Sequence, residues 1–227
     1  MSLRTSGEFL TRSGLRDAVI ILSAASALFC TVGAAEITVA FLLLCLGSFI
    51  HFVVKGVLIR NEVLCTDGVY RLARHPYYLA NYLVDSGFCL LSGNRYLLLL
   101  YPFLFFWSYG PTLRKEEGTL TEKHGDASVA YLLSAPPVFP DRHSILNVSR
   151  LFANFSLARV SGKEVARITR FYAAALLILA FHKGAGKIPY AGFLSARATL
   201  ALLIPALLLY FAAFIILKLA KRPVENA

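Results

Sequence analysis

The chain has 227 residues, of which 57% are hydrophobic and 16% are charged, and its formal net charge is +10. Soluble domains are about 45–50% apolar and about 25% charged, so this composition argues against an ordinary soluble enzyme and indicates one integral membrane domain over residues 1–227. The excess of basic residues is typical of membrane proteins that meet anionic headgroups. The chain lacks a basic patch with interleaved aromatic residues, so nothing indicates nucleic-acid binding.

Apolar runs along the chain predict an all-α bundle of about five or six transmembrane helices. The runs cover residues 17–35, 37–59, 78–91, 96–113, 168–181 and 193–220. A span needs about 20 apolar residues, so the run 168–181 predicts a short span or a re-entrant segment. Small residues at Gly33-Ala-Ala end the first run, which leaves a signal peptide as a second interpretation of that run.

The segments between and after these runs complete the predicted organisation. The runs 78–91 and 96–113 would form a hairpin that turns at Ser92-Gly-Asn-Arg. In the segment 141–167, apolar residues from 145 to 157 recur at helical spacing, which predicts an amphipathic helix in the membrane interface. Residues 168–220 would form a C-terminal helical hairpin. Six spans put both termini on one side, where most Lys and Arg residues lie, so we expect a multi-pass protein with cytoplasmic termini.

The four cysteines show no framework of paired residues. Cys30, Cys45 and Cys89 fall in apolar runs, Cys65 stands apart, and no pair has Cys-x-x-Cys spacing. We therefore predict neither a disulfide framework nor a bound metal. The chain also has no P-loop and no Gly-x-Gly-x-x-Gly motif, so nothing indicates a soluble nucleotide-binding domain.

Two polar motifs flank the predicted hairpin. The first runs from Thr66 to Tyr78 and contains Arg74-His75-Pro76, and the second is Glu116-Glu117. A hairpin returns the chain to the side that it left, so both motifs can meet at one face of the bilayer. Ionisable residues beside a membrane are costly and tend to serve a function. The two motifs therefore predict a pocket at the cytoplasmic face for a small charged molecule.

Pro76 predicts how the first motif is built. A proline biases the preceding residue toward extended backbone and suits the first turn of a helix, so the motif should be a loop that leads into a helix at Tyr77 or Tyr78. The unpaired N–H groups of a helix start can bind a carboxylate. Arg74 and His75 lie beside that start and would reinforce the binding of an anion.

These motifs resemble a known family. Gly68-Val-Tyr70, Arg74-His75-Pro76-x-Tyr78, Glu116-Glu117-x-x-Leu120, His124-Gly125, Tyr131 and Pro140 are similar to the isoprenylcysteine carboxyl methyltransferase and phospholipid methyltransferase superfamily of integral membrane methyltransferases. The resemblance covers about residues 36–140, a methyltransferase-like core. It implies bound S-adenosylmethionine, and the residues that would hold it are Val63, Leu64, Cys65, Tyr70, His75, Pro76, Tyr78, Glu116 and Glu117.

The resemblance also implies roles for the charged residues. Arg74, His75 and the helix start would bind the carboxylate of the cofactor, and a glutamate would bind its ammonium group or ribose diol. The face of Tyr70 or Tyr78 would favour the sulfonium by cation–π attraction. A carboxylate acceptor needs no base, whereas an amine or thiol acceptor would need one, for which His75, His124 or a glutamate is a candidate.

The chain departs from the family at one position that bears on the acceptor. The prenylcysteine enzymes carry an arginine about four residues before the first glutamate of the pair, and this chain has Thr112 there. Arg114 lies on the same helix end and is predicted to contact an anionic acceptor in its place. Arg74, His75 and Arg114 are therefore the candidate catalytic residues.

The sequence thus predicts a membrane enzyme that transfers methyl from S-adenosylmethionine to a lipophilic or prenylated acceptor among membrane lipids, first an isoprenylcysteine-type carboxylate. A phospholipid or other lipid amine is the alternative acceptor, and an NADPH-dependent reductase of sterol-reductase type is the alternative enzyme. A scaffold or transporter is a third interpretation. Two polar residues within predicted spans have two possible roles each: Asp85 can serve a site or a structural pair, and His51 can line a polar groove or bond to a neighbouring helix.

Overall fold

The computed structural model describes residues 12–57, 64–146 and 151–188, together with Leu208 and Ile215. These residues form seven α-helices and two short 3-10 helices, and none of them lies in a strand. The all-helical fold class predicted from the apolar runs is therefore confirmed. The last predicted span, residues 193–220, lies outside the described residues except for Leu208 and Ile215.

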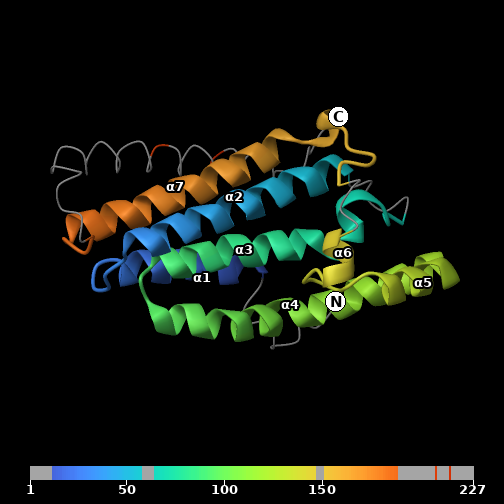
Figure 1. Cartoon of the computed structure of the whole chain (residues 1–227), viewed down its shortest axis with the longest axis horizontal. Coiled ribbons are helices and arrows are strands. Elements are labelled where there is room, and N and C mark those ends of the chain that lie inside the picture. The colour runs from blue at the N-terminus through green and yellow to red at the C-terminus, as the bar shows by residue number, and fades with distance from the viewer. Residues whose placement is uncertain (1–11, 58–63, 147–150, 189–207, 209–214, 216–227) are drawn as a thin grey trace, which may run out of the picture.

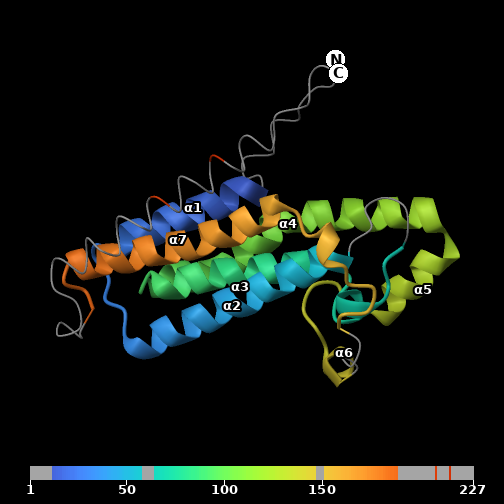
Figure 2. The same cartoon turned by 90° about the horizontal axis from the view of Figure 1, so that it is seen from above.

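Five longer helices form the body of the molecule (Figures 1 and 2). They are α1 (Arg12–Ser26), α2 (Ala34–Val57), α3 (Pro76–Leu91), α4 (Arg95–His124) and α7 (Gly162–Gly184). The second half of α4 runs past the other helices, and α5 (Asp126–Ser134) folds back beside it (Figure 2). The shorter elements are η1 (Gly68–Arg71), α6 (Arg142–Leu146) and η3 (Leu157–Arg159).

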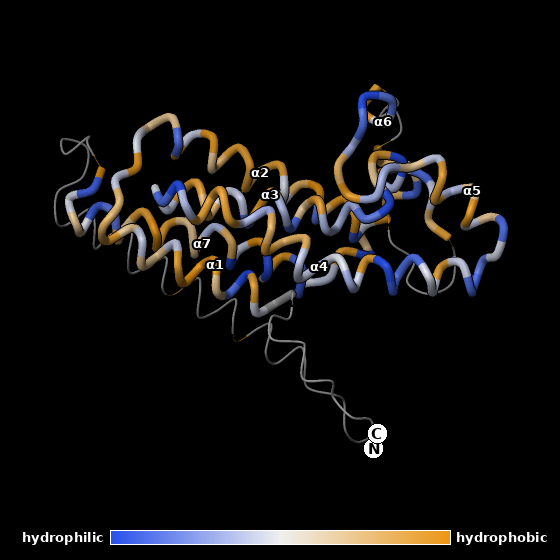
Figure 3. The backbone as a smooth tube through the Cα atoms, turned by 90° about the horizontal axis from the view of Figure 1, so that it is seen from below, coloured by the Kyte–Doolittle hydropathy of each residue, from blue (hydrophilic) through white to orange (hydrophobic). Residues whose placement is uncertain are grey.

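Two of the described helices, α2 and α7, are long and apolar enough to cross a membrane. Helix α1 is shorter than the first predicted span, and α4 changes from apolar to polar along its length (Figure 3). Helix α7 begins at Gly162, well before the predicted start at residue 168, so its length suits a full span. Its first turns carry charged residues that the apolar run excluded, among them Glu164 and Arg167, which lie 2.5 Å apart and offset each other's charge.

The predicted hairpin is confirmed as α3 followed by α4. Gly93 makes the turn with φ +67°, a conformation that glycine adopts without strain. The side chain of Asn94 then caps α4, because its Oδ1 accepts the N–H groups of Tyr96 at 3.0 Å and Leu97 at 3.2 Å. The two ends of the hairpin therefore come back to the same end of the bundle, as the motif argument requires.

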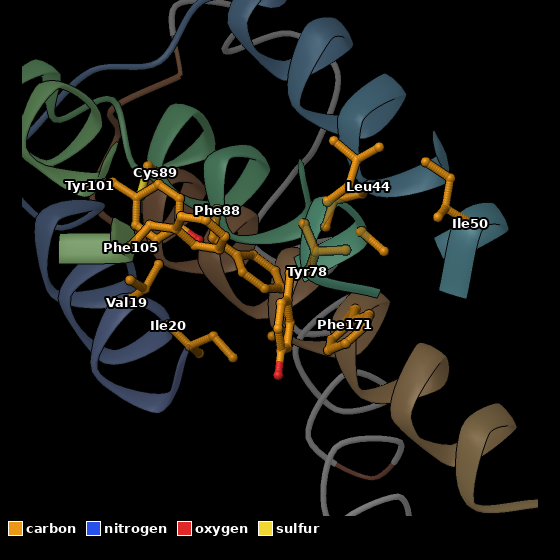
Figure 4. Close-up of a cluster of buried hydrophobic side chains, with 14 of the residues drawn as sticks. Val19, Ile20, Leu44, Ile50, Tyr78, Phe88, Cys89, Tyr101, Phe105 and Phe171 are labelled. Atoms are coloured by element: carbon orange, nitrogen blue, oxygen red, sulfur yellow. The ribbon is translucent and has the colours of Figure 1, made fainter. Parts of the chain in front are cut away.

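Helices α2 and α3 pack closely against each other, because a glycine of each helix faces the other. A Cβ atom on Gly47 would lie 2.7 Å from Val84 Cγ2 and 2.8 Å from the Ala80 carbonyl oxygen, and one on Gly87 would lie 3.0 Å from the Ala40 carbonyl oxygen. Beside this contact, aromatic rings of α3 and α4 fill the core, among them Phe88, Tyr101 and Phe105 (Figure 4).

This glycine contact leads to a prediction about stability. Gly47→Val should destabilise the protein by about 1–3 kcal/mol, because the added methyl groups overlap Val84 and the α3 backbone. The control is Gly118→Ala on α4, where a Cβ atom meets nothing within 4 Å, and helix propensity should add about 0.5–1 kcal/mol. Thermal unfolding in detergent measures both. Equal unfolding temperatures for the two variants would show that α2 and α3 are not packed this closely.

The buried carboxylate of Asp85 belongs to a structural network. Arg16 on α1 donates from Nε to Asp85 Oδ1 at 2.7 Å and from Nη2 to Asn81 Oδ1 at 2.7 Å. The Tyr101 hydroxyl on α4 donates to Asp85 Oδ2 at 3.0 Å. Of the two roles that the sequence left open for Asp85, the structure supports pairing, since these bonds tie α1 and α4 to α3.

The single helix predicted over residues 145–157 is not formed in the described part of that segment. Helix α6 ends at Leu146, and residues 151–154 form a turn. The segment bonds to α2 instead of continuing a helix: the Ser156 N–H donates to the Gly56 carbonyl at 2.9 Å, and the Arg159 side chain donates from Nη1 to the same carbonyl at 3.3 Å. The helical prediction was wrong because these contacts with the end of α2 satisfy the backbone.

Candidate functional site

The first motif is held in place by backbone pairing with a distant segment. The N–H of Arg74 donates to the Pro136 carbonyl at 2.8 Å, and the N–H of His75 donates to the Pro137 carbonyl at 2.9 Å. His75 has φ −120° and ψ 63°, which is outside the helical region but not the extended backbone predicted, and α3 begins at Pro76, one residue before the predicted start. The segment after α5 thus fixes the position of Arg74 and His75 at the start of α3.

The structure brings the two predicted motifs into direct contact. The Tyr78 hydroxyl donates to Glu116 Oε1 at 2.6 Å, and Nε2 of His75 lies 3.3 Å from Glu117 Oε1. The other ring nitrogen of His75, Nδ1, lies 3.6 Å from Glu116 Oε2. Arg74 Nη1 lies 3.4 Å from Glu117 Oε1. We call these five residues the motif cluster.

The motif cluster is partly buried, and the ring of Tyr78 packs against two other rings. The His75 side chain is 8% exposed and that of Glu116 is 43% exposed, so the cluster reaches from the protein interior to its surface. The ring of Tyr78 stacks on His75 with centroids 5.6 Å apart and meets Tyr109 edge-on at 5.1 Å. The imidazole of His75 and the carboxylates of Glu116 and Glu117 therefore lie together at the start of α3.

The motif cluster carries a net negative charge. Burial lowers the pKa of His75 below its ordinary value, and the two neighbouring glutamates oppose only part of that effect. The imidazole is therefore neutral at neutral pH, which leaves the Arg74 cation against the carboxylates of Glu116 and Glu117. A cationic molecule is favoured beside such a cluster.

Arg74 has a hydrogen-bond donor in this cluster that could bind a ligand. Its Nε atom is buried and has no hydrogen-bond partner among the described residues. A buried donor without a partner is costly, so this atom suits a ligand acceptor such as a carboxylate. A guanidinium for a carboxylate, glutamates for an ammonium group or diol, and aromatic faces for a sulfonium together fit the chemical groups of S-adenosylmethionine.

The remaining residues predicted from the sequence lie at different distances from the motif cluster. Tyr70 is in η1, and its carbonyl accepts the Tyr131 hydroxyl at 2.8 Å. Burial raises the pKa of Tyr70 and of Tyr131, and the neighbouring Cys65 adds to the increase. Leu64 is half-buried just before it, and Val63 lies outside the described residues. Leu64 and Cys65 thus lie just before η1, the element that carries Tyr70.

Arg114 is the predicted residue that the structure does not bring into the motif cluster. It is exposed on α4, two residues before Glu116. Glu117 of the motif cluster lies three residues after Arg114, and its contacts run to Arg74 and His75. His124 is likewise separate, in the last turn of α4.

Sequence reasoning missed residues that support the motif cluster. Tyr109 packs against Tyr78, and the carbonyls of Pro136 and Pro137 hold the first motif. The signal for Tyr109 was its spacing: it precedes Glu116 by two helical turns and so shares its face of α4. No local pattern points to the two prolines, because their pairing partner lies far away in the chain.

The lowered pKa of His75 predicts how stability depends on pH. The ordinary histidine pKa is about 6.5, so the unfolded chain binds a proton at His75 before the folded protein does as the pH falls. The stability from neutral His75 is thus fully present above about pH 6.5 and is lost below it. We expect His75→Asn to lose less stability than the parent between about pH 7 and pH 5 in thermal unfolding. Identical pH profiles would contradict the lowered pKa.

A cavity of about 700 Å³ lies at the opposite end of α3 from the motif cluster, between the start of α2 and the α3–α4 turn. Its lining includes Glu36, Gly93 and Arg95. The carboxylate of Glu36 accepts the N–H of Gly33 at 3.1 Å, so it serves the start of its own helix. The cavity does not bring together reactive groups, and the motif cluster is the stronger candidate site.

Comparison with known proteins gives one informative similarity. No protein-family model matches the chain, and no solved structure does so either. A protein-S-isoprenylcysteine O-methyltransferase of Schizosaccharomyces pombe (strain 972 / ATCC 24843) is 30% identical over 95 residues, which are 41% of this chain and 39% of that protein. The chain therefore matches about two fifths of the length of this curated relative. This similarity confirms the resemblance to the isoprenylcysteine carboxyl methyltransferases that the Arg-His-Pro and Glu-Glu motifs indicate.

Proposed function

We propose that this protein is an integral membrane methyltransferase that uses S-adenosylmethionine and methylates a lipophilic acceptor, first an isoprenylcysteine-type carboxylate. The observation that carries the proposal is the contact of the two motifs across the α3–α4 hairpin, where His75 and Tyr78 meet Glu116 and Glu117. The similarity to a protein-S-isoprenylcysteine O-methyltransferase supports the same reaction class.

Residues of the motif cluster would hold S-adenosylmethionine, which supplies a methyl group on a cationic sulfur when it is bound. The Nε atom of Arg74 and the start of α3 would bind its carboxylate, and Glu116 and Glu117 would bind its ammonium group or ribose diol. Leu64, Cys65 and Tyr70 would border the same molecule from the loop before α3. The chain's main contribution to the rate is alignment, which can be worth about 7–11 kcal/mol.

The acceptor chemistry follows from the charges around the motif cluster. A carboxylate acceptor reacts through an oxygen that carries no proton, so the protein need supply only position. A lipid amine is the second candidate acceptor, and neutral His75 beside Glu117 favours it, since a neutral imidazole can remove the proton of an ammonium group. The net negative charge of the cluster disfavours the phosphates of NADPH, and with it the reductase alternative.

The placement in the membrane follows from the apolar helices and the distribution of basic residues. We propose a multi-pass protein of five or six spans with both termini and the motif cluster at the cytoplasmic face. In this arrangement, residues 36–140 form the methyltransferase-like core, residues 141–167 lie at the interface, and residues 168–220 add a helical hairpin. The apolar helices α2 and α7 support the proposal.

Calorimetry tests the proposed cofactor. Purified protein in detergent or lipid nanodiscs is titrated with S-adenosylhomocysteine, the product form of the cofactor, and separately with NADPH. We expect binding of S-adenosylhomocysteine and none of NADPH. Binding of NADPH alone would favour the reductase, and binding of neither would favour a scaffold or transporter.

A further inference from the structure

The first turn of α3 presents two adjacent tyrosines to two different charged clusters. Tyr78 donates its hydroxyl to Glu116 at 2.6 Å in the motif cluster. The Tyr77 hydroxyl instead accepts a hydrogen bond from Arg167 on α7. The ammonium of Lys55 on α2 lies 5.0 Å from the centroid of the Tyr77 ring. Adjacent residues on a helix point about 100° apart, so the start of α3 separates the two clusters.

The second cluster consists of Lys55, Glu164 and Arg167, and we call it the basic cluster. Glu164 lies 3.5 Å from the Lys55 ammonium and 2.5 Å from the Arg167 guanidinium. The Glu164 side chain is 7% exposed, whereas those of Lys55 and Arg167 are 27% and 29% exposed. One buried carboxylate thus faces two cations, and the cations are the groups that reach the surface. These described residues together carry a net positive charge.

Buried polar atoms beside the basic cluster have no hydrogen-bond partner among the described residues. His51 lies one turn before Lys55 on the same face of α2, and its ring meets Tyr77 edge-on with centroids 4.5 Å apart. The ring is 1% exposed. Asn81 is nearby, but neither nitrogen of His51 reaches a hydrogen-bond partner among the described residues. Unpaired polar atoms at such a depth are costly, and a polar ligand group would satisfy them.

We propose that Lys55 and Arg167 form a subsite that binds the carboxylate of the lipophilic acceptor. This subsite rests on the proposed function. The rings of Tyr77 and Tyr78 have centroids 6.5 Å apart, so the subsite lies directly beside the motif cluster. Coulomb attraction would place the methyl donor and the acceptor at different clusters, because the acidic motif cluster favours a cationic donor and the basic cluster favours an anionic acceptor.

The basic cluster would also replace the arginine that the prenylcysteine enzymes have at the position of Thr112. Thr112 carries no charge, and Arg114 is exposed on α4. The cation that an anionic acceptor needs is supplied instead from α2 and α7. Arg167 lies beyond the methyltransferase-like core of residues 36–140, which gives the C-terminal region of this chain a role in selecting the acceptor.

Equilibrium binding of two matched probes tests the subsite without any turnover. The probes are N-acetyl-S-farnesylcysteine with a free carboxylate and the same molecule as its carboxamide. Each is titrated into protein in nanodiscs of zwitterionic phospholipid, and the ratio of the two dissociation constants is the readout. We expect the parent to prefer the carboxylate, and Arg167→Gln to reduce that preference by about tenfold, as loss of one charge-assisted contact implies. Glu164→Gln should instead increase it, since it removes the opposing anion.

Lys163→Gln is the matched control, because it removes one cation from an exposed position on the same helix. Its probe ratio should equal that of the parent. An unchanged ratio in both Arg167→Gln and Lys55→Gln would overturn the subsite. Loss of the preference in Arg114→Gln would overturn it too, by placing the acceptor carboxylate at α4.

Two further measurements separate this subsite from folding and from the proposed function. If Arg167→Gln does not fold, Arg167→Gln combined with Glu164→Gln removes both charges of the ion pair, and we expect it to fold and to prefer the carboxylate through Lys55. Equal binding of both probes by this double variant would overturn the subsite. S-adenosylhomocysteine should bind the Arg167 variants as it binds the parent. Absence of that binding in the parent would contradict the proposed function. The ratio of the two probe dissociation constants tests the subsite independently of that result.

Discussion

Replacing Glu116 by Gln lowers the affinity for S-adenosylhomocysteine by about 10- to 100-fold, the loss expected for a charged hydrogen-bonding group worth roughly 1.5–3 kcal/mol. Glu116 accepts the Tyr78 hydroxyl at 2.6 Å and lies 3.6 Å from His75. His75→Ala should weaken binding to a similar extent, because it removes the imidazole between Tyr78 and Glu117. Calorimetry with purified protein measures both affinities.

Both variants should fold, which makes the loss of binding interpretable. The His75 side chain makes no capping bond to α3, and Glu116 is partly exposed. Glu122→Gln is the matched control, since it neutralises an exposed carboxylate on the same helix. A variant at Glu116 or His75 that binds like the parent would remove that residue from the site.

The largest effect on stability is expected at the buried ion pair of Arg16 and Asp85. Asp85→Ala should cost about 3–5 kcal/mol, because it leaves the Arg16 guanidinium buried without its carboxylate and the Tyr101 hydroxyl without its acceptor. Thermal unfolding in detergent gives the change. Asp17→Asn is the control: Asp17 pairs with Arg170 but is 48% exposed, so its loss should cost less than about 1 kcal/mol. Similar losses in the two variants would contradict the structural role of Asp85.

The meeting of the two motifs could be predicted from the sequence because each step is local. A turn at Ser92–Asn94 between two apolar runs specifies a hairpin, and Pro76 specifies where α3 begins. A hairpin alone brings His75 and Glu116 to one end of the bundle. The all-helical fold follows from the same apolar runs, although only α2 and α7 among the described helices have the length and apolar character of a span.

What the sequence did not reveal depends on contacts between distant segments. The pairing of Arg74 and His75 with Pro136 and Pro137 has no local signal, because any backbone carbonyl could serve. Periodicity alone predicted a helix over residues 145–157, but the Ser156 N–H donates to the distant Gly56 carbonyl instead. The apolar run predicted a segment that starts at residue 168, whereas α7 begins at Gly162 and contains the paired charges of Glu164 and Arg167.

Transfer of an isotopically labelled methyl group tests the central claim most directly. Purified protein in phospholipid vesicles is incubated with labelled S-adenosylmethionine and N-acetyl-S-farnesylcysteine, and the products are separated and treated with base. We expect label in a base-labile methyl ester of the probe, at background level with Glu116→Gln and at the parent's level with Glu122→Gln. Absence of label from every lipophilic product, in protein that is shown to be folded, would contradict a membrane methyltransferase.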